Sequence, residues 1–381
     1  MKIGIDAMGY HDGYVSWRRI LVNLIDSILL DTQNEYVIFL SKKHKHLNFP
    51  IPKGSRVKFL YFNIRSGKVT YNNLILRLCV YPFYAYKEKI DVMLYQYYTP
   101  FWGRAKNISL IPDVLFKDYP ALYMQRDHIF LYPQKIFTRM AAAAITISNS
   151  EKERCIKHGY AVAKRIEYFP LAYSSNFKAI EQHPESRIKQ VKEKYNLPDD
   201  FILFVGLLSA RKNIDNLLRA LPLITAPISL VLTGESNNAG AVLTKHTQLV
   251  ENLGIKSRVQ YTGFVGEEDL YVLFACAKVF CFPSFAEGFG LPPLEAMASG
   301  VPVAVSNTTS LPEVCGEAGT YFDPHKPEEI AKAIMKLLND PDYYNEMKLK
   351  GLEQAKKFSW EKSAEKVLRF LTYVHNNYRL D

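Results

Sequence analysis

Short apolar segments alternate with amphipathic segments along most of the chain, and this alternation limits the folds that the chain can adopt. Near the N-terminus an apolar segment at 2–6 precedes a helical pattern at 18–30 and a second apolar segment at 35–40. After a polar stretch at 178–200 the alternation begins again with the apolar segment 201–206. Strands that alternate with helices build parallel sheets covered by helices on both faces. The sequence therefore predicts an α/β fold with two doubly wound domains.

The expected strands fall into two sets, which agrees with a length of 381 residues, because one core rarely serves so long a chain. We expect strands at 2–6, 35–40, 56–62, 90–95, 107–111 and 144–148, then at 201–206, 228–234, 258–264, 278–282 and 301–305. We expect helices at 18–30, 73–89, 213–221, 269–277, 294–300, 327–340 and 360–380. Ligands of such sheets bind beyond the carboxyl ends of the strands.

Charge is distributed unevenly between the two halves. Residues 1–170 hold 25 Lys and Arg against 13 Asp and Glu, whereas residues 171–381 hold 23 against 25. A basic half favours partners that carry phosphate, such as an anionic membrane, a lipid-linked substrate or a nucleic acid. The sequence contains no zinc-finger, RRM or basic-zipper pattern. We therefore expect no nucleic-acid partner.

Basic and aromatic segments lie close together in the first half. The basic segments are 41–46 and 87–89, and the aromatic segments are 81–86 and 95–102. This combination is typical of the headgroup region of a membrane, and it predicts peripheral contact with an anionic membrane surface. The alternative is that the aromatic residues pack against the sheet and the lysines only contact solvent.

The compartment is predicted from what the sequence lacks. No segment reaches the about 20 uncharged apolar residues that cross a bilayer. The first ten residues lack the long apolar run of a signal peptide. The five cysteines are an odd number without a C-x-x-C pair, which is typical of reduced thiols. We expect a cytoplasmic protein, with the inner face of the cytoplasmic membrane as its site of peripheral contact.

The segment FVGLLSARKNIDNLL at 204–218 has the features of a phosphate-binding turn. Gly206 ends a strand and allows close approach of a ligand, and Asn213 is placed to cap the next helix. Between them Arg211 and Lys212 offer fixed charges for a diphosphate, each charge-assisted bond contributing roughly 1.5–3 kcal/mol. The alternative is an ordinary solvated basic turn. Neither a P-loop nor a G-x-G-x-x-G motif is present, which disfavours a P-loop NTPase and a dinucleotide oxidoreductase.

Two glutamates, Glu287 and Glu295, enclose a stretch rich in glycine and proline within residues 281–307. The pattern places Glu287 in a loop after a strand and Glu295 in the first turn of the next helix, beside exposed backbone N–H groups. Carboxylates accept hydrogen bonds from sugar hydroxyls, so the pair suits two polyol rings joined by a diphosphate. The alternatives, for each residue taken singly, are that Glu287 is a solvated loop residue and that Glu295 favours its own helix dipole.

The segment from Glu287 to Glu295 resembles the E-x7-E signature of family 4 glycosyltransferases, which are retaining enzymes of the GT-B fold. Other parts resemble the same family. They are the turn at 204–221, the strands at 231–235 and 259–265, the segment at 145–154 and the stretches at 310–324 and 358–368. The resemblance implies two Rossmann-like domains that face a central crevice. It implies an acceptor-binding domain at 1–172, a nucleotide-sugar domain at 173–357 and a helix at 358–381 that crosses back to the first domain.

The resemblance also implies roles for individual residues. Glu287 binds the transferred hexose, while Arg211 and Lys212 neutralise the diphosphate leaving group; these three are the expected catalytic residues. The two cations replace a metal, so no metal and no cofactor beyond the GDP- or UDP-sugar co-substrate is expected. Glu295 binds the ribose, and residues 264–265 lie near the base. With these, the expected donor-binding residues are Gly206, Phe264, Val265, Gly288, Phe289, Gly290, Leu291 and Glu295.

The first half departs from the family pattern at two places. The glycine-rich loop after the first strand is reduced to Gly13, with Ser16 at the following helix as a remaining group for phosphate. At 111–120 Pro112 stands where many members have a histidine close to the transferred sugar. Asp113 remains, with a structural role or a contact to the acceptor as alternatives. Either another group contacts the sugar, or activity is reduced or absent.

These observations predict a retaining, metal-independent hexosyltransferase. Its donor is a nucleotide-diphosphate sugar, with mannose from GDP-mannose favoured, and its acceptor is a glycan or a lipid-diphosphate-linked glycan of a cell-surface polysaccharide. One alternative is a catalytically weak nucleotide-sugar-binding subunit that assists a partner transferase. Another is a GT-B sugar-nucleotide epimerase, which the intact E-x7-E motif disfavours.

Overall fold

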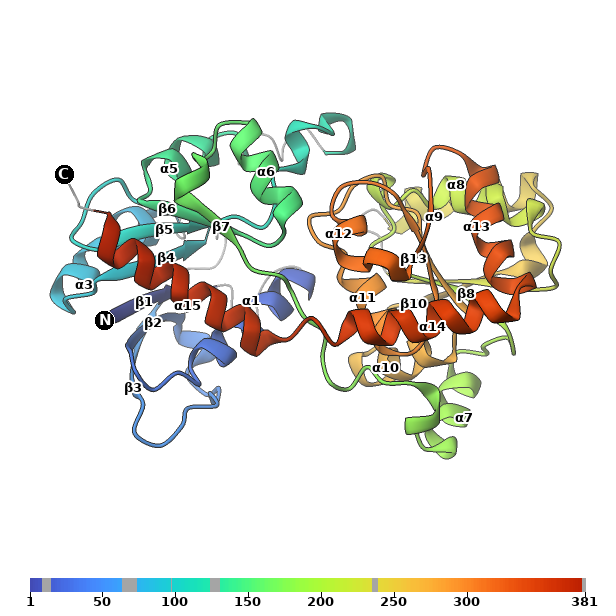
Figure 1. Ribbon diagram of the computed structural model, residues 1–381, viewed down its shortest axis with the longest axis horizontal. Coiled ribbons are helices and arrows are strands. Elements are labelled where there is room, and N and C mark those ends of the chain that lie inside the picture. Colours follow the sequence, from blue (N-terminus) through green and yellow to red (C-terminus); the bar gives the residue numbers. More distant parts are fainter. Residues whose placement is uncertain (9–14, 64–73, 97, 124–130, 235–238, 379–381) are drawn as a thin grey trace. The chain divides into compact units, whose positions relative to one another are not determined.

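The computed structural model describes residues 1–8, 15–63, 74–96, 98–123, 131–234 and 239–378 (Figure 1). The chain forms two compact units. The N-terminal unit comprises Met1–Leu171 together with Ser359–Asp381, and the C-terminal unit comprises Ala172–Phe358. Each boundary lies one residue from the boundary expected from the sequence.

The N-terminal unit contains a seven-stranded parallel sheet in the order β3-β2-β1-β4-β5-β6-β7. Its strands are β1 (Lys2–Asp6), β2 (Glu35–Ser41), β3 (Arg56–Phe62), β4 (Val92–Gln96), β5 (Lys106–Leu110), β6 (Ala143–Thr146) and β7 (Ile166–Tyr168). The first six match the expected strands within two residues at each end. Strand β7 was not expected, since three residues show no periodicity.

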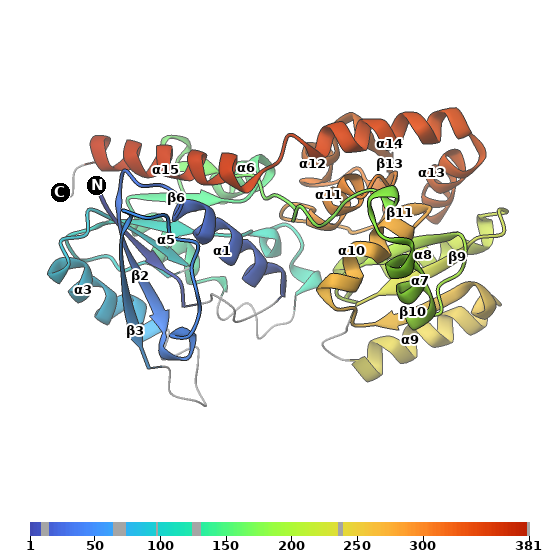
Figure 2. The same cartoon turned by 90° about the horizontal axis from the view of Figure 1, so that it is seen from below.

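Helices cover this sheet. They are α1 (Val15–Ile28), the π-helical turn η2 (Leu76–Val80), α3 (Tyr81–Lys87), α5 (Gln134–Met140), α6 (Asn149–Lys157) and α15 (Trp360–Asn377). Helix α15 packs along α1, so the last helix of the chain belongs to the N-terminal unit (Figure 2). Its Ser359 caps the helix by accepting a hydrogen bond from the Lys362 N–H.

The C-terminal unit contains a six-stranded parallel sheet in the order β10-β9-β8-β11-β12-β13. Its strands are β8 (Phe201–Val205), β9 (Ser229–Thr233), β10 (Val259–Gly263), β11 (Val279–Phe282), β12 (Val303–Ser306) and β13 (Gly319–Phe322). Its helices are α7 (Glu185–Lys194), α8 (Ile214–Ala220), α9 (Ala239–Asn252), α10 (Glu267–Cys276), α11 (Leu291–Ala298), α12 (Leu311–Cys315), α13 (Pro327–Asn339) and α14 (Pro341–Ala355).

The order of strands reverses at the centre of the second sheet. From β8 the chain builds outward through β9 to β10, and then returns to β11 on the other side of β8. Phe201–Phe204 of β8 and Val279–Phe282 of β11 are buried, as expected for central strands covered on both faces. Open α/β sheets bind ligands at the carboxyl ends of the strands beside such a reversal.

Helix α11 begins earlier than the sequence predicted. We expected a helix at 294–300 with Glu295 in its first turn, but the helix starts at Leu291 and its first turn contains no acidic residue. Pro292 and Pro293 occupy that turn, because the first N–H groups of a helix have no intrahelical partner and proline lacks this group. The alternative that Glu295 serves its helix dipole is therefore wrong.

A glycine stands at or directly after the end of three neighbouring strands of the C-terminal unit, which allows their backbones to approach closely. Gly206 follows β8, Gly234 follows β9, and Gly263 ends β10. The Gly206 N–H donates to Thr233 O at 3.0 Å, and the Gly234 N–H donates to Gly263 O at 3.0 Å. Gly234 has φ +136°, and a Cβ atom on it would lie 2.0 Å from Gly206 O.

We expect Gly234→Ala to lower the free energy of unfolding by about 2 kcal/mol or more, because it combines backbone strain with a backbone clash. The matched control is Gly266→Ala, since a Cβ atom at Gly266 meets no atom within 4 Å. Its cost should stay below about 1 kcal/mol. Urea unfolding is to be followed by circular dichroism, because all three tryptophans lie in the N-terminal unit. Equal losses in both variants contradict the prediction.

Candidate active site

The basic pair and one of the two glutamates lie together at the strand reversal. Arg211 and Lys212 belong to a short 3₁₀ turn, η7 (Ala210–Lys212), between β8 and α8. Glu287 lies in the loop between β11 and α11. The turn and the loop follow the two adjacent central strands, so residues 75 positions apart in the chain meet at the same edge of the sheet.

One carboxylate binds both cations. Glu287 Oε2 lies 2.8 Å from Arg211 Nη1, and Glu287 Oε1 lies 2.7 Å from Lys212 Nζ. The Lys212 Nζ also lies 4.4 Å from the centre of the Phe282 ring, within the range of a cation–π interaction. The side chains of Lys212 and Glu287 are each 9% exposed, whereas that of Arg211 is 26% exposed. The sequence did not predict these ion pairs, which join the two expected binding groups.

The ion pairs keep Glu287 ionised. Burial raises the pKa of this carboxyl, but the charges of Arg211 and Lys212 and their hydrogen bonds outweigh burial and lower it to about 2. Burial lowers the pKa of Lys212, and Arg211 adds to this effect while Glu287 opposes it, so that the pKa of Lys212 is about 8. Glu287 is therefore a permanent anion near neutral pH, and Lys212 is a cation that can lose its proton at moderately alkaline pH.

The loop of Glu287 is tied to the basic turn by its backbone. The Phe285 N–H donates to Arg211 O at 2.9 Å, and Arg211 Nη1 donates to Ala286 O at 2.6 Å. Asn213 Nδ2 donates to Pro283 O at 2.9 Å and to Pro324 O at 2.6 Å. The expectation that the Asn213 side chain caps α8 is wrong. Asn213 precedes the helix in a left-handed conformation with φ +56°, and its amide binds these two carbonyl groups instead.

The other donor-binding residues expected from the sequence lie in the segments that follow strands β8, β10 and β11. Glu295 lies on α11 and is 2% exposed. Phe289 is buried against Phe358, with ring centres 5.9 Å apart. Gly290 has φ +117°, which a non-glycine residue rarely adopts. Leu291 begins α11 and is partly exposed, while Gly288 is buried.

The two residues expected near a nucleotide base differ in exposure. Phe264 follows β10 and is 61% exposed, and the adjacent Val265 is 5% exposed. An exposed ring offers a stacking surface for a planar base. Gly206 lies beside the basic side chain, since a Cβ atom on it would lie 3.5 Å from Lys212 Cε.

The expected residues of the N-terminal unit are only partly described. Gly13 lies outside the described residues, and the side chain of Ser16, within α1, is not described. Asp113 lies in the loop after β5 and is partly buried, and its Oδ1 accepts the Leu115 N–H at 3.4 Å. This contact holds the loop in place.

Sequence reasoning missed a buried carboxylate beside Asp113. Glu151 Oε2 accepts the Val114 N–H at 2.9 Å, and Glu151 is fully buried in the first turn of α6. Burial, followed by the charge of Asp113, raises the pKa of Glu151 to about 8. The pattern S-x-x-E at 148–151 is a capping box, a signal that predicts a helix start but not this contact.

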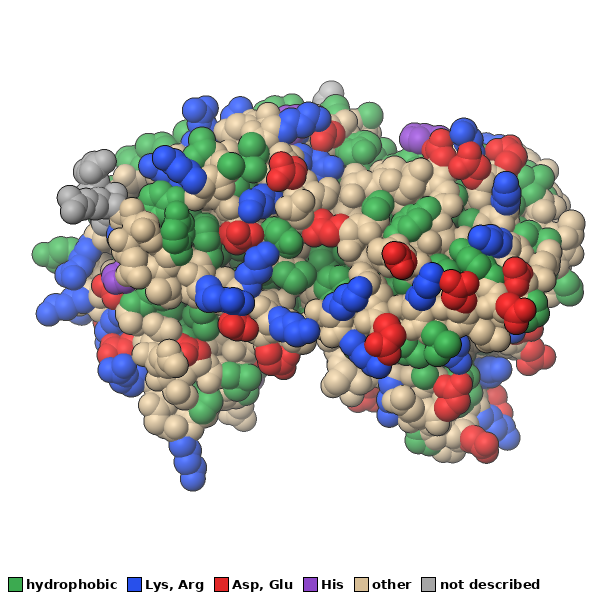
Figure 3. Space-filling view, viewed as in Figure 1, with side chains coloured by type: hydrophobic (Ala, Val, Ile, Leu, Met, Phe, Trp, Pro, Cys, Tyr) green, Lys and Arg blue, Asp and Glu red, His purple; other side chains and the backbone are tan. Residues whose placement is uncertain are grey.

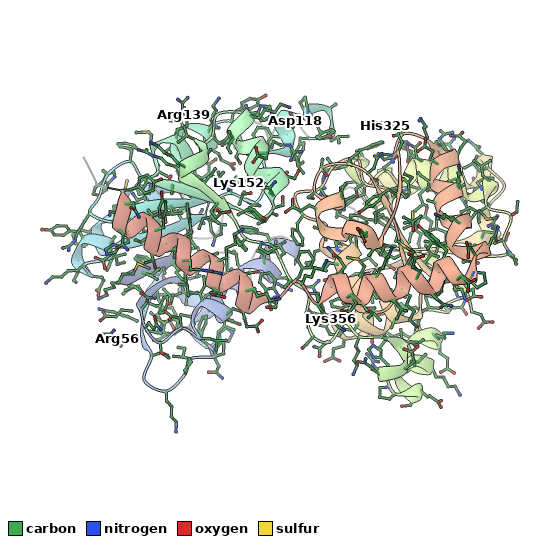
Figure 4. All side chains as sticks on the ribbon, viewed as in Figure 1. Arg56, Asp118, Arg139, Lys152, His325 and Lys356 are labelled. Atoms are coloured by element: carbon green, nitrogen blue, oxygen red, sulfur yellow. The ribbon has the colours of Figure 1, made fainter. Side chains whose placement is uncertain are left out.

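A second carboxylate ties the same loop to α6. Asp118 accepts from Arg154 Nε at 2.8 Å and lies 2.7 Å from His158 Nε2. Figure 4 labels Asp118, Lys152 of α6 and, in the C-terminal unit, His325. The segment after β5 is thus bonded to α6 by two acidic side chains, Glu151 and Asp118.

The ring of His325 stacks on Phe285 of the Glu287 loop, with ring centres 4.8 Å apart.

Asp340 and Asp342 form the only Asp-x-Asp pair of the sequence. Asp340 Oδ1 accepts the Tyr343 N–H at 2.9 Å and caps α14. The pair therefore belongs to the start of α14 rather than to the edge of the sheet.

Residues 185–371 match the family described as Glycosyl transferases group 1. The serotype-specific mannosyltransferase WbdA of Escherichia coli is 36% identical over 239 residues, which cover 61% of this chain and 29% of that protein. The O-antigen chain mannosyltransferase B of Escherichia coli is 39% identical over 226 residues, which cover 58% of each chain. The chain therefore spans less than two thirds of the length of these relatives.

The sucrose-phosphate synthase structure from Thermosynechococcus elongatus superposes with a TM-score of 0.74 at 20% identity, over 99% of this chain and 100% of that chain. This likeness concerns the fold alone. Together with two parallel α/β sheets it confirms the prediction of a GT-B fold with two Rossmann-like domains.

We expect Glu287→Gln to lower the free energy of unfolding at pH 7 by about 3 kcal/mol, because two cations lose their counter-charge. The pKa of Glu287 falls from its ordinary 4.5 to about 2 on folding. Its contribution is thus complete above pH 4.5 and is lost as the pH falls towards 2. Urea unfolding at pH 7, 5, 4 and 3 should show the difference between wild type and variant shrinking below pH 4.5.

The control for this prediction is Glu353→Gln, since Glu353 is 70% exposed and pairs with the exposed Lys356. This substitution should change stability by less than about 0.5 kcal/mol at every pH. A difference between wild type and Glu287→Gln that stays constant down to pH 3 contradicts the assignment of an ionised, paired Glu287.

Proposed function

Since the chain belongs, through residues 185–371, to the group 1 glycosyl transferases, we propose that it is a retaining glycosyltransferase. It transfers a hexose from a nucleotide-diphosphate sugar to a glycan or lipid-diphosphate-linked acceptor. The observation that supports this proposal most is the buried cluster of Arg211, Lys212 and Glu287 at the strand reversal. Two cations and a carboxylate at this edge match the diphosphate and hydroxyl groups of such a donor.

The two cations interact with the diphosphate in different ways. Arg211 is the more exposed, so its planar guanidinium contacts the phosphate oxygens directly. Lys212 is held behind it against Glu287 and the Phe282 ring, where it adds positive charge in a site of low dielectric. As the bond to the sugar breaks, negative charge grows on the leaving diphosphate, and these fixed charges stabilise it without a metal.

Glu287 binds the sugar while it keeps its ion pairs with Arg211 and Lys212. A carboxylate has about four lone-pair positions, and the two ion pairs use one on each oxygen. The remaining positions accept hydrogen bonds from hydroxyl groups of the hexose. The buried Glu295 of α11 binds the ribose hydroxyls, and the exposed Phe264 stacks on the base.

The relatives support a choice of sugar and of pathway. The two relatives compared are mannosyltransferases, and one is named for the O-antigen chain. We therefore propose mannose, carried by GDP, as the transferred sugar and a cell-surface polysaccharide as the product. The chain acts in the cytoplasm, on acceptors presented at the inner face of the membrane. Helices with the length and apolar character of a membrane span are absent from the described part of the chain.

The exposed aromatic residues support a membrane contact of the N-terminal unit. Tyr81 and Tyr95, from the two aromatic segments, are fully buried and pack in the core. Phe83, Tyr86 and Trp102 are 59%, 68% and 47% exposed. The last three line a hollow of about 510 Å³, with Pro82, Gly103 and Arg104. The aromatic segments thus contain both core and surface residues.

Basic side chains accompany this hollow. Arg104 lines it, and Lys87 is exposed at the end of α3, next to Tyr86 in the chain. Arg139 is exposed on α5 of the same unit (Figure 4). Lys and Arg side chains are spread widely over the N-terminal unit in Figure 3. We propose that the face of the N-terminal unit that carries this hollow contacts an anionic membrane, with the aromatic rings at headgroup depth.

The test of the transferase is a panel of UDP-, GDP- and ADP-sugars, with thermal shift and donor hydrolysis as the two measurements. We expect GDP-mannose to raise the melting temperature and to be hydrolysed slowly. Glu287→Ala should reduce hydrolysis by about 100-fold and donor binding much less, because the carboxylate acts mainly in the transition state. Lys350→Ala is the control, since Lys350 pairs with Glu346 on the surface.

The outcomes separate the candidate functions. Stabilisation without hydrolysis favours a nucleotide-sugar-binding subunit, which the replacement of the family histidine by Pro112 also supports. Release of a free epimerised nucleotide sugar favours an epimerase. Equal loss of binding and hydrolysis in Glu287→Ala contradicts the role assigned to Glu287.

The membrane contact is tested with liposomes of phosphatidylglycerol and phosphatidylcholine. We expect the protein to sediment with the anionic vesicles at about 20 mM salt. It should be released at about 500 mM salt, because salt screens the attraction. The double variant Tyr86→Ser and Trp102→Ser should weaken binding about tenfold or more. Leu223→Ser, at an exposed residue of the C-terminal unit, is the control. Binding that is absent at low salt contradicts the proposal.

A further inference from the structure

Three consecutive hydroxyl side chains follow strand β12 and contact the loop of Glu287. Thr308 Oγ1 donates to Phe285 O at 3.0 Å, and Ser310 Oγ donates to Glu287 O at 2.8 Å. Between them, Thr309 Oγ1 accepts the backbone N–H of Glu287 at 2.9 Å. The N–H and the carbonyl group of Glu287 are thus both held by side chains from the neighbouring strand connection.

The backbone of Thr309 is in an unfavourable conformation. Its φ is +54°, in the left-handed region. Among the described residues other than glycine, Lys89, Asn196 and Asn213 share a positive φ, and none of these is β-branched. Left-handed geometry is a genuine outlier for a β-branched residue, because its Cβ substituents crowd the backbone. Such conformations persist where surrounding contacts enforce them, and they concentrate at functional sites.

A residue chosen only for this backbone shape would be glycine or asparagine, which adopt it at lower cost. Threonine adds a hydroxyl group on Cβ, and in this structure that hydroxyl is the acceptor for the Glu287 N–H. The cost of the left-handed backbone is therefore linked to a contact with the residue that pairs with both cations.

The contact determines where the carboxylate of Glu287 can lie. On one side, the loop is bonded to the basic turn through Phe285 N–H and Arg211 O. On the other side, the Glu287 N–H is directed at Thr309 Oγ1. With the backbone fixed on both sides, the short Glu287 side chain reaches Arg211 and Lys212 together.

We propose that Thr309 is a positioning residue of this site. Its left-handed backbone aims Oγ1 at the Glu287 N–H, and this bond holds the Glu287 carboxylate between Arg211 and Lys212. The effect on turnover rests on the proposed transferase function, whereas the effect on the loop does not.

Three substitutions of Thr309 separate positioning from simple stabilisation. Thr309→Ser keeps the hydroxyl group. Thr309→Ala and Thr309→Gly both remove it, but only glycine also relieves the backbone strain. We therefore expect the glycine variant to melt at a higher temperature than the alanine variant. The two should nevertheless share the same functional loss.

The first measurement needs no ligand. Hydrogen exchange of the peptide covering residues 281–290 is followed by mass spectrometry in the full chain. We expect exchange in this peptide to accelerate about tenfold in both the alanine and the glycine variants and to stay near wild type in the serine variant. The control is Thr320→Ala, which removes a hydroxyl contact to Tyr343 elsewhere in the same unit and should leave this peptide unchanged.

The second measurement is hydrolysis of the donor that the wild type accepts. The alanine and glycine variants should lose about tenfold or more in kcat with little change in KM, and serine should restore most of it. Unchanged exchange in the glycine variant, or activity that follows melting temperature across the series, overturns the proposal. A wild type that hydrolyses no donor defeats the transferase proposal instead, and the exchange result then decides the role of Thr309.

Discussion

The arrangement of the candidate site depends on one buried carboxylate that neutralises two cations. A buried charge without a partner costs several kcal/mol, so neither Lys212 nor Glu287 would remain charged alone at its position. Paired, they join the turn after β8 to the loop after β11, and Arg211 completes the cluster. The same contacts therefore stabilise the edge of the sheet and assemble charges that suit a diphosphate and a polyol.

The backbone supports this pairing by packing very closely around it. Gly206 and Gly234 meet at a distance that leaves no room for a Cβ atom, and Asn213 and Thr309 adopt left-handed conformations beside the ion pairs. Each of these features costs conformational free energy. Their concentration at one edge of one sheet indicates that the positions of a few side chains are maintained at the expense of local stability.

Hydrophobic periodicity predicted most strands and the position of Arg211, Lys212 and Glu287 at strand ends, because that signal is local in the chain. Strands β7 and β13 were missed, since IEY at 166–168 and GTYF at 319–322 lack the apolar runs by which the other short strands were found. The start of α11 was missed because Pro292 and Pro293 are typical of loops as well as of a first helical turn. The roles of Glu151 and Thr309 arise from contacts between distant segments, which no local pattern specifies.

Protonation of Lys212 links the charge of the site to its ligand. With Lys212 protonated, the cluster of two cations and one anion carries one net positive charge, and above a pH of about 8 the loss of that proton makes it neutral. A diphosphate placed beside Arg211 stabilises the protonated amine, and so binding raises the pKa of Lys212. When the diphosphate leaves, the amine becomes easier to deprotonate. In the proposed transferase, the positive charge of this buried lysine therefore persists to higher pH while the donor is bound.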